Sequence, residues 1–156
     1  APDSDEVFDF TAEFTFPTGT DQKTLGGVKA NGTVINLADG KTHTFKLKDK
    51  ENIKFTELPV GTTIKVTEAA KANYKGSVVV TLNGVETSKA ATKYNEAITA
   101  SGKLGQKKNI VDVTNRFNNV PTTGIIMNTL PYVLMVALCA VALFGFVAFK
   151  RKKVQK

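Results

Sequence analysis

The feature that most constrains this chain is an uncharged apolar run near its carboxy-terminal end. Residues 130–149 contain no Asp, Glu, Lys or Arg, and residues 133–149 contain no strongly polar side chain. At about 1.5 Å of rise per residue, a helix of this length covers about 30 Å, which matches the hydrocarbon thickness of a bilayer. The run therefore predicts a transmembrane helix over residues 130–149.

The residues on either side of this run predict its orientation. Pro131 suits the first turn of a helix, where its missing N–H would be unsatisfied in any case. Five of the seven residues in 150–156 are Lys or Arg, and such flanks stay on the cytoplasmic side. We therefore expect a basic cytoplasmic tail, with everything before residue 130 outside the cell. A tail anchor or a late stop-transfer segment would share these features.

Charge and cysteine content narrow the class of protein further. The formal net charge is +7, but residues 150–156 supply five positive charges and leave +2 for the rest (7 minus 5). Most of the positive net charge thus belongs to the predicted cytoplasmic tail, and no nucleic-acid partner is expected. The only cysteine, Cys139, lies inside the predicted span, so the exported part cannot use disulfides. Because the chain opens without a secretion signal, we expect Ala1 to begin a fragment or a processed chain.

The residues before the run predict one all-β ectodomain. In residues 7–16, phenylalanines alternate with polar residues, which is the period-two pattern of a half-buried strand. More short strands follow, broken by turns and without helical periodicity, and this indicates an antiparallel sandwich. Strands are predicted at residues 33–37, 42–47, 53–58, 63–68, 77–82 and 109–117, with 97–100 as a weaker candidate.

The connections between these strands give local predictions. Residues 48–51 predict a charged hairpin turn that pairs the strands on either side, and Asn83-Gly84 is a strong signal of a two-residue hairpin. Residues 22–40 read as a long connection that holds a short strand. Residues 69–72 could form a helical turn, and the polar residues 87–94 predict a loop.

Two polar residues fall on apolar strand faces. Because side chains alternate along a strand, Glu68 shares a face with Ile64 and Val66, and Asn115 shares a face with neighbouring valines. A carboxylic acid and a carboxamide that face a core are costly unless they are hydrogen-bonded or neutral. Both residues could instead sit at wet strand ends, or bond each other and nearby backbone.

The segment before the apolar run carries a recognisable pentapeptide. Val120, Pro121, Thr122, Thr123 and Gly124, followed by an apolar span and a basic tail, resemble the cell-wall sorting signal of Gram-positive surface proteins, with valine in place of the usual leucine. Proline favours an extended conformation of the residue before it, which suits a protease-like cleft. The resemblance implies that a sortase cleaves the Thr123–Gly124 bond. A short linker before an ordinary single-pass anchor is the alternative.

Five blocks of the ectodomain resemble a second family. Residues 8–10, 45–49, 53–62, 66–68 and 113–117 are similar, in the same order, to the carboxy-terminal domain of Gram-positive backbone pilins. These domains are immunoglobulin-like sandwiches of the Cna B type. The resemblance covers most of residues 7 to 124 and implies the same fold here.

This resemblance also implies a covalent crosslink. In the family, a lysine on the first strand forms an amide with an asparagine on the last strand, helped by an acidic residue. Asn115 matches the acceptor and Glu68 matches the helper, but this chain has no lysine before Lys23. The first strand is therefore missing or comes from elsewhere. We expect an exposed sheet edge or groove beside the last strand, lined by Glu68 and Asn115.

No other catalytic set stands out in the sequence. His43 is the only histidine and has no cysteine or second histidine with it, so neither a metal site nor a triad is expected. We predict that His43 is a strand residue near the surface and that the chain uses no cofactor. Beyond self-crosslinking, no enzyme activity is expected.

Together these patterns predict a wall-anchored surface protein, most simply a pilin or fibrillar stalk domain. Its expected partners are a sortase, peptidoglycan or a lysine of another pilin subunit, and the membrane. A host-binding adhesin and a simple membrane-anchored receptor module remain alternatives. The predicted organisation is a disordered or truncated first-strand region at 1–6, a sandwich at 7–118, a sorting-signal linker at 119–129, the span at 130–149 and the tail at 150–156.

Overall fold

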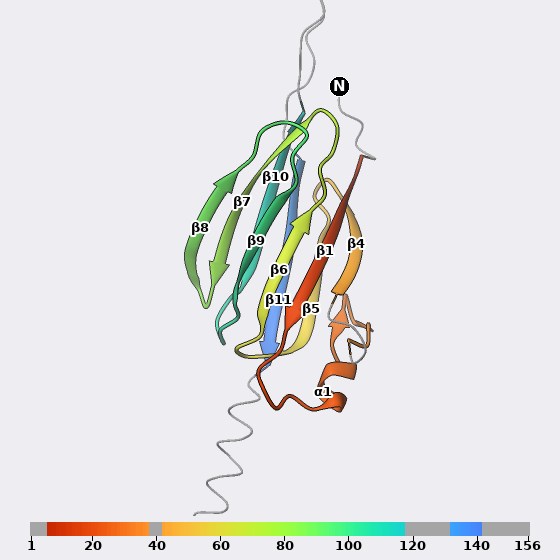
Figure 1. Ribbon diagram of the computed structural model, residues 1–156, viewed down its shortest axis with the longest axis vertical. Helices are drawn as coiled ribbons and strands as arrows, with labels where there is room; N and C mark the ends of the chain where they lie inside the picture. The colour runs from red at the N-terminus through yellow and green to blue at the C-terminus, as the bar shows by residue number, and fades with distance from the viewer. Residues whose placement is uncertain (1–5, 38–41, 118–131, 142–156) are drawn as a thin grey trace, which may run out of the picture.

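The computed structural model of the chain describes residues 6–37, 42–117 and 132–141. Two β-sheets face each other across one core (Figure 1). The predicted linker at 119–129, with its pentapeptide at 120–124, lies outside the described residues. The same holds for residues 1–5 and for 142–156, which include the rest of the predicted span and the basic tail.

The described residues form strands and one short helix. In chain order these are β1 (Val7–Thr15), α1 (Gln22–Gly26), β2 (Lys29–Ala30), β3 (Thr33–Val34), β4 (Thr42–Lys48), β5 (Asn52–Pro59), β6 (Thr63–Glu68), β7 (Tyr74–Leu82), β8 (Val85–Ala91), β9 (Ile98–Lys103), β10 (Ile110–Phe117) and β11 (Tyr132–Val141).

The strands are arranged as a four-stranded and a seven-stranded sheet. The smaller sheet has the order β4-β1-β6-β9, and the larger has the order β3-β2-β5-β11-β10-β7-β8. Neighbouring strands are antiparallel except for β5 and β11, which are parallel. The all-β sandwich predicted from the sequence is confirmed, with one parallel pair that was not expected.

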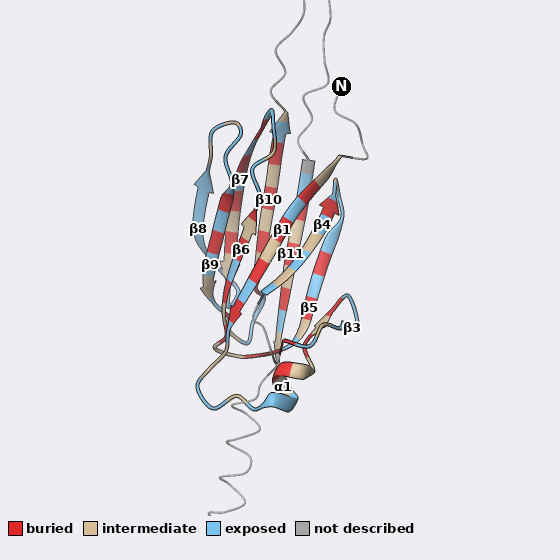
Figure 2. Cartoon of the chain, turned by 45° about the vertical axis from the view of Figure 1, so that its right-hand side comes forward, coloured by how far each residue is buried: buried red, intermediate tan, exposed pale blue. Residues whose placement is uncertain are grey.

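The core lies between the two sheets and follows the predicted alternation. On β1, Phe8, Phe10 and Phe14 are at most 2% exposed. Figure 2 shows buried and exposed residues alternating along the strands of both sheets. Phe14 meets Phe55 of the opposite sheet edge to face, with 5.2 Å between ring centres. Aromatic contacts of this kind bury large apolar areas, which explains why phenylalanine dominates the first strand.

The predicted hairpin around residues 48–51 is wrong. β4 pairs with β1 in the smaller sheet, whereas β5 pairs with β2 and β11 in the larger one. The connection therefore crosses from one sheet to the other. The physical reason is that Leu47 on β4 and Phe55 on β5 are both buried, so the two strands cover the core from opposite sides.

The remaining connections give mixed outcomes. The Asn83-Gly84 hairpin is confirmed, because both residues have positive φ, +52° and +80°, as the tight turn between β7 and β8 requires. Residues 87–91, predicted as loop, belong instead to β8, whose side chains are all exposed (Figure 2). Pairing with β7, rather than burial, makes this edge strand. Residues 69–72 are not helical, and a short helix forms at α1, capped by the side chain of Asp21.

The described part of the predicted membrane span is a strand. Residues 132–141 form β11, which lies between β5 and β10 in the larger sheet (Figure 1), so the helix predicted for these residues is wrong here. Leu134, Val136 and Leu138 reach the core, and each is at most 2% exposed. A continuous apolar run is compatible with a buried strand as well as with a buried helix, and its periodicity does not distinguish the two. Within the described residues, no helix has the length and hydropathy to cross a bilayer.

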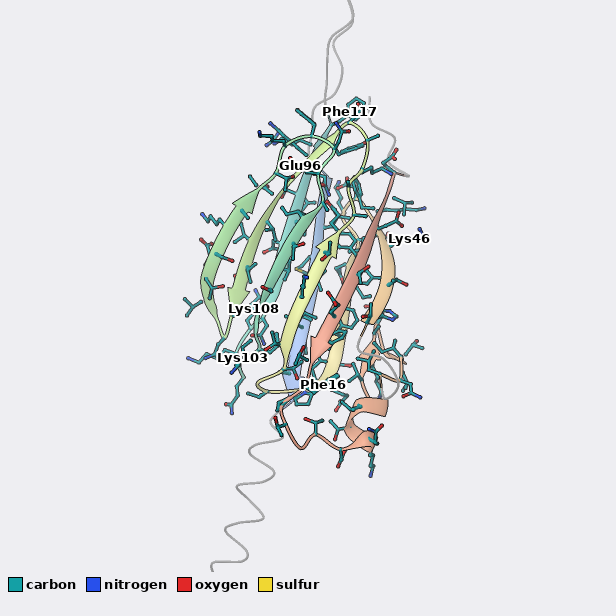
Figure 3. The ribbon with its side chains drawn as sticks, in the orientation of Figure 1. Phe16, Lys46, Glu96, Lys103, Lys108 and Phe117 are labelled. Atoms are coloured by element: carbon teal, nitrogen blue, oxygen red, sulfur yellow. The ribbon has the colours of Figure 1, made fainter. Side chains whose placement is uncertain are left out.

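The start of β1 and the end of β10 lie at the same end of the sandwich. Tyr74 packs between Phe8 and Phe117, with ring centres 5.1 and 5.2 Å away. Figure 3 labels Phe117 at this end, with Phe16 near the opposite end. β11 starts beside Asn115 and runs away from this end, antiparallel to β10.

Candidate crosslinking site

Glu68 and Asn115 meet in the core and link the two sheets. Glu68 ends β6 in the smaller sheet, and Asn115 lies on β10 in the larger one. The Asn115 Nδ2 donates a hydrogen bond of 2.6 Å to Oε2 of Glu68. Their exposed fractions are 2% and 4%. The predicted inward orientation of both residues is confirmed. Of the two explanations that the sequence left open, the structure supports a hydrogen bond between Glu68 and Asn115 rather than exposure of both residues at strand ends.

The walls of this site are apolar side chains and one glycine. Glu68 is level with Phe10 on β1 and with Ile98 on β9. Gly76 on β7 is the register partner of Asn115, and a Cβ there would come within 3.2 Å of Asn115 Oδ1. A glycine inside a strand often marks such a close approach. Sequence reasoning missed Gly76 because the strand was predicted to begin one residue later.

Burial controls the charge state of Glu68. Desolvation raises its pKa from 4.5 to about 7, while the hydrogen bond from Asn115 and the positive charge of Lys71 oppose this rise. A substantial fraction of Glu68 is therefore protonated near neutral pH. A carboxyl group poised in this way can both donate and accept protons, which is a requirement of general acid–base chemistry.

Lys71 places a positive charge near Glu68, and its amine is held by the start of β1. Its Nζ donates to the backbone oxygen of Val7 at 2.8 Å and forms an ion pair of 2.7 Å with Glu6. The same amine lies 5.4 Å from the centre of the Phe8 ring. These contacts tie the start of β1 to the segment after β6, so Lys71 serves as an anchor for the first strand.

The orientation of the carboxamide matters for its chemistry. Acid assistance to amide formation requires a protonated carboxyl that donates to the carboxamide oxygen, whereas here the Asn115 nitrogen donates to Glu68. A half-turn of the carboxamide would bring Oδ1 to Glu68. The residue opposite Asn115 on β11 is Tyr132, which has no amine. The groove expected beside the last strand is thus filled by β11 in this structure.

His43 and the sorting pentapeptide lie apart from this site. His43 is on β4, half-buried, with its ring centre 5.8 Å from that of Phe55 and 6.1 Å from that of Phe45. Burial lowers its pKa below the ordinary value of 6.5. Val120, Pro121, Thr122, Thr123 and Gly124 fall outside the described residues.

Comparison with known proteins adds two findings. Residues 1–117 match a family described as "Domain of unknown function (DUF7601)". The chain is also similar to a curated protein named "Pilin" from Streptococcus pyogenes serotype M1, with 34% identity over 133 residues. The aligned region is 85% of this chain and 37% of that relative, so the chain spans little more than a third of the relative's length.

Proposed function

Since the chain belongs to the family described as a domain of unknown function, DUF7601, and is similar to a pilin, we propose that it is a structural module of a pilus. The observation that carries this proposal is the similarity to the pilin, which extends over 85% of the chain. The module is displayed on the cell surface and associates with other pilin subunits. It is structural rather than enzymatic, and its only chemistry is its own crosslinking.

The proposed crosslink joins Asn115 to a lysine that this chain does not supply. A neutral lysine amine attacks Cγ of Asn115, the bond from Cγ to Nδ2 breaks, and one amide and one ammonia are formed. Glu68 in its protonated form polarises the carboxamide and carries the proton from the incoming amine to the leaving nitrogen. Support comes from the direct contact and the burial of Glu68 and Asn115, and from the raised pKa of Glu68.

A chain extended upstream tests the crosslink. We expect its intact mass to fall by the mass of one ammonia, about 17 Da, because one ammonia leaves for each amide formed. Glu68→Ala and Asn115→Ala variants of the same extended chain should keep the full mass. An unchanged mass in the extended chain, with the lysine-bearing strand present, would remove the crosslink from the proposal.

The proposed link to the envelope runs through the pentapeptide. A sortase cleaves between Thr123 and Gly124 and transfers the new carboxyl end to peptidoglycan or to a lysine of another subunit. In the membrane-bound precursor, residues 130–149 enter the membrane, so residues 132–141 are then absent from the position that β11 holds in the larger sheet. Residues 150–156 stay in the cytoplasm. Support comes from the tripartite order of pentapeptide, uncharged run and basic tail.

Polymerisation is the experiment that tests the pilus function. In a Gram-positive host with its sortases, the protein that contains this module should form a ladder of SDS-resistant species. Thr123→Ala should abolish the ladder, whereas Glu68→Gln should leave it in place, because the two residues serve different bonds. A single wall-linked monomer band would instead favour an adhesin.

A further inference from the structure

The position between β5 and β10 must be filled by a strand. In the described residues β5 and β10 do not pair with each other; each pairs with β11. Without an occupant, both strands would present unpaired backbone groups, and the core would open at Val136, which is fully buried. We call this position, between Asn52–Pro59 and Ile110–Phe117, the strand slot.

Hydrogen bonds at both ends of the strand slot reach only the backbone of β11. The side chain of Asp49 accepts from the backbone N–H of Val133 at 2.9 Å. The backbone N–H of Leu138 donates to the backbone oxygen of Asn109 at 3.0 Å. The side-chain Nδ2 of Asn109 donates to the backbone oxygen of Leu138 at 3.3 Å. Backbone groups are the same in every residue except proline, so another strand of this length can make the same bonds.

The two faces of β11 match the strand slot unequally. Toward the core, Leu134, Val136 and Leu138 are at most 2% exposed and complete the packing. The outward side chains are also apolar, and Val133 is 45% exposed. The sheet around them is mainly polar on this face. Ile110 is an apolar outward residue of β10, but the other outward residues of β5 and β10 here are Asn52, Lys54, Asp112, Thr114 and Arg116.

A strand that belongs on a solvated sheet normally has one apolar and one polar face. β11 has the inward face that the slot requires and an outward face that suits lipid better than water. The same residues are half of the uncharged run at 130–149, which is long enough to span a bilayer. β11 therefore has an alternative environment that an amphipathic strand would not have.

We propose that the strand slot is a binding site for an amphipathic strand, and that residues 132–141 occupy it as a replaceable strand. The incoming strand carries apolar residues at the positions of Leu134, Val136 and Leu138, and polar residues between them. It keeps the core contacts and the backbone bonds of β11. On the outer face it adds polar cross-strand pairs with Lys54 and Asp112, which apolar side chains do not provide.

A synthetic peptide tests this proposal on the full chain. The peptide has the sequence of residues 132–141 with Val133→Thr, Met135→Lys, Ala137→Thr and Cys139→Glu, so that only the outward face is changed. Hydrogen exchange of the chain is followed by mass spectrometry with and without the peptide. Residues 132–141 should be protected in the chain alone, because their amides pair with β5 and β10.

Saturating peptide should raise exchange in residues 132–141 by about tenfold or more, while 52–59 and 110–117 remain protected. A control peptide with the further change Val136→Asp should have no effect, because a carboxylate cannot enter the core. Protection of 132–141 that persists at saturation would overturn the proposal. Loss of protection in all three segments would also overturn it, since the peptide would then unfold the domain rather than replace β11.

Two variants of the chain should shift the exchange in opposite directions. Leu134→Ala removes core contacts of β11, so the peptide concentration that displaces half of β11 should fall by about tenfold or more. Val133→Thr makes the outward face of β11 more polar, so displacement of β11 should require a higher peptide concentration than in the unmodified chain. Equal peptide requirements in both variants would contradict the proposal. A dimer in light scattering, with 132–141 exchanged between copies, would assign the slot to a second copy and overturn it as well.

Discussion

Replacing Glu68 with glutamine should remove a pH dependence of stability that one buried carboxyl group creates. Glu68 is 4% exposed and accepts one hydrogen bond from Asn115. In Glu68→Gln, the carboxamide oxygen can still accept that bond, and the side-chain volume is nearly unchanged. The substitution therefore isolates ionisation from packing.

The magnitude follows from the two pKa values. The folded state raises the pKa of Glu68 from 4.5 to about 7, so between these pH values the folded chain binds more protons than the unfolded chain. The free energy of unfolding then falls as pH rises through this window, by about 1.4 kcal/mol per pH unit at most. Over the whole window the loss is about 3 kcal/mol, a large part of the 5–15 kcal/mol typical of a domain.

Urea unfolding followed by circular dichroism at pH 4, 6 and 8 measures this effect, since the chain has no tryptophan to serve as a probe. The Glu68→Gln chain should match the unmodified chain within about 1 kcal/mol at pH 4 and exceed it by about 3 kcal/mol at pH 8. His43 and Asp112 also have shifted pKa values, but they titrate in both proteins and cancel in the difference.

Glu13→Gln is the matched control. Its carboxylate is also on a strand of the smaller sheet, but the side chain is 51% exposed, so the substitution should leave the pH profile unchanged. The reasoning fails if the Glu68→Gln and unmodified chains keep a constant difference from pH 4 to pH 8. It also fails if Glu13→Gln alters the profile as much as Glu68→Gln does.

Four more substitutions test the site and the sheet. Asn115→Ala removes a hydrogen bond that lowers the pKa of Glu68, so a carbon-13 NMR titration should find that pKa higher than in the unmodified chain; an equal or lower value would contradict the geometry. Gly76→Ala places a Cβ within 3.2 Å of Asn115 Oδ1 and should cost about 1–3 kcal/mol in urea unfolding, whereas no loss would show that the carboxamide moves freely. Leu138→Ala should cost about 2–5 kcal/mol while Val133→Ala costs under 1 kcal/mol, and equal small effects would place β11 outside the core in solution.

The sequence predicted the local pattern of the sandwich well. Period-two alternation in residues 7–16 and the Asn83-Gly84 turn depend on side chains close together in the chain, and both were confirmed. Pairing depends on distant strands, and here the local signals misled. The charged turn at 48–51 joins two sheets rather than two paired strands, because each flanking strand must bury its own apolar face.

The candidate site was predictable in part. Glu68 and Asn115 stood out because a polar residue interrupts an apolar face, and the structure brings them into contact. Gly76 was missed because the strand was predicted to begin at residue 77, and because its closeness to Asn115 depends on the pairing of β7 with β10. β11 was missed because its residues are apolar at every position, and such a run gives no period by which strand and helix can be distinguished.

The direction of β11 determines how the module would respond to tension. Val7 at the start of β1 and Phe117 at the end of β10 lie at the same end of the sandwich, where Tyr74 packs against both strands. β11 then carries the chain to Val141 at the other end. Inter-strand hydrogen bonds lie across the strands, so a pull between Val7 and Phe117 would break them one after another, as in peeling. A pull between Val7 and Val141 would be directed along the strands and would load those bonds together, in shear. Removal of β11 would therefore convert a shear geometry into a peeling one.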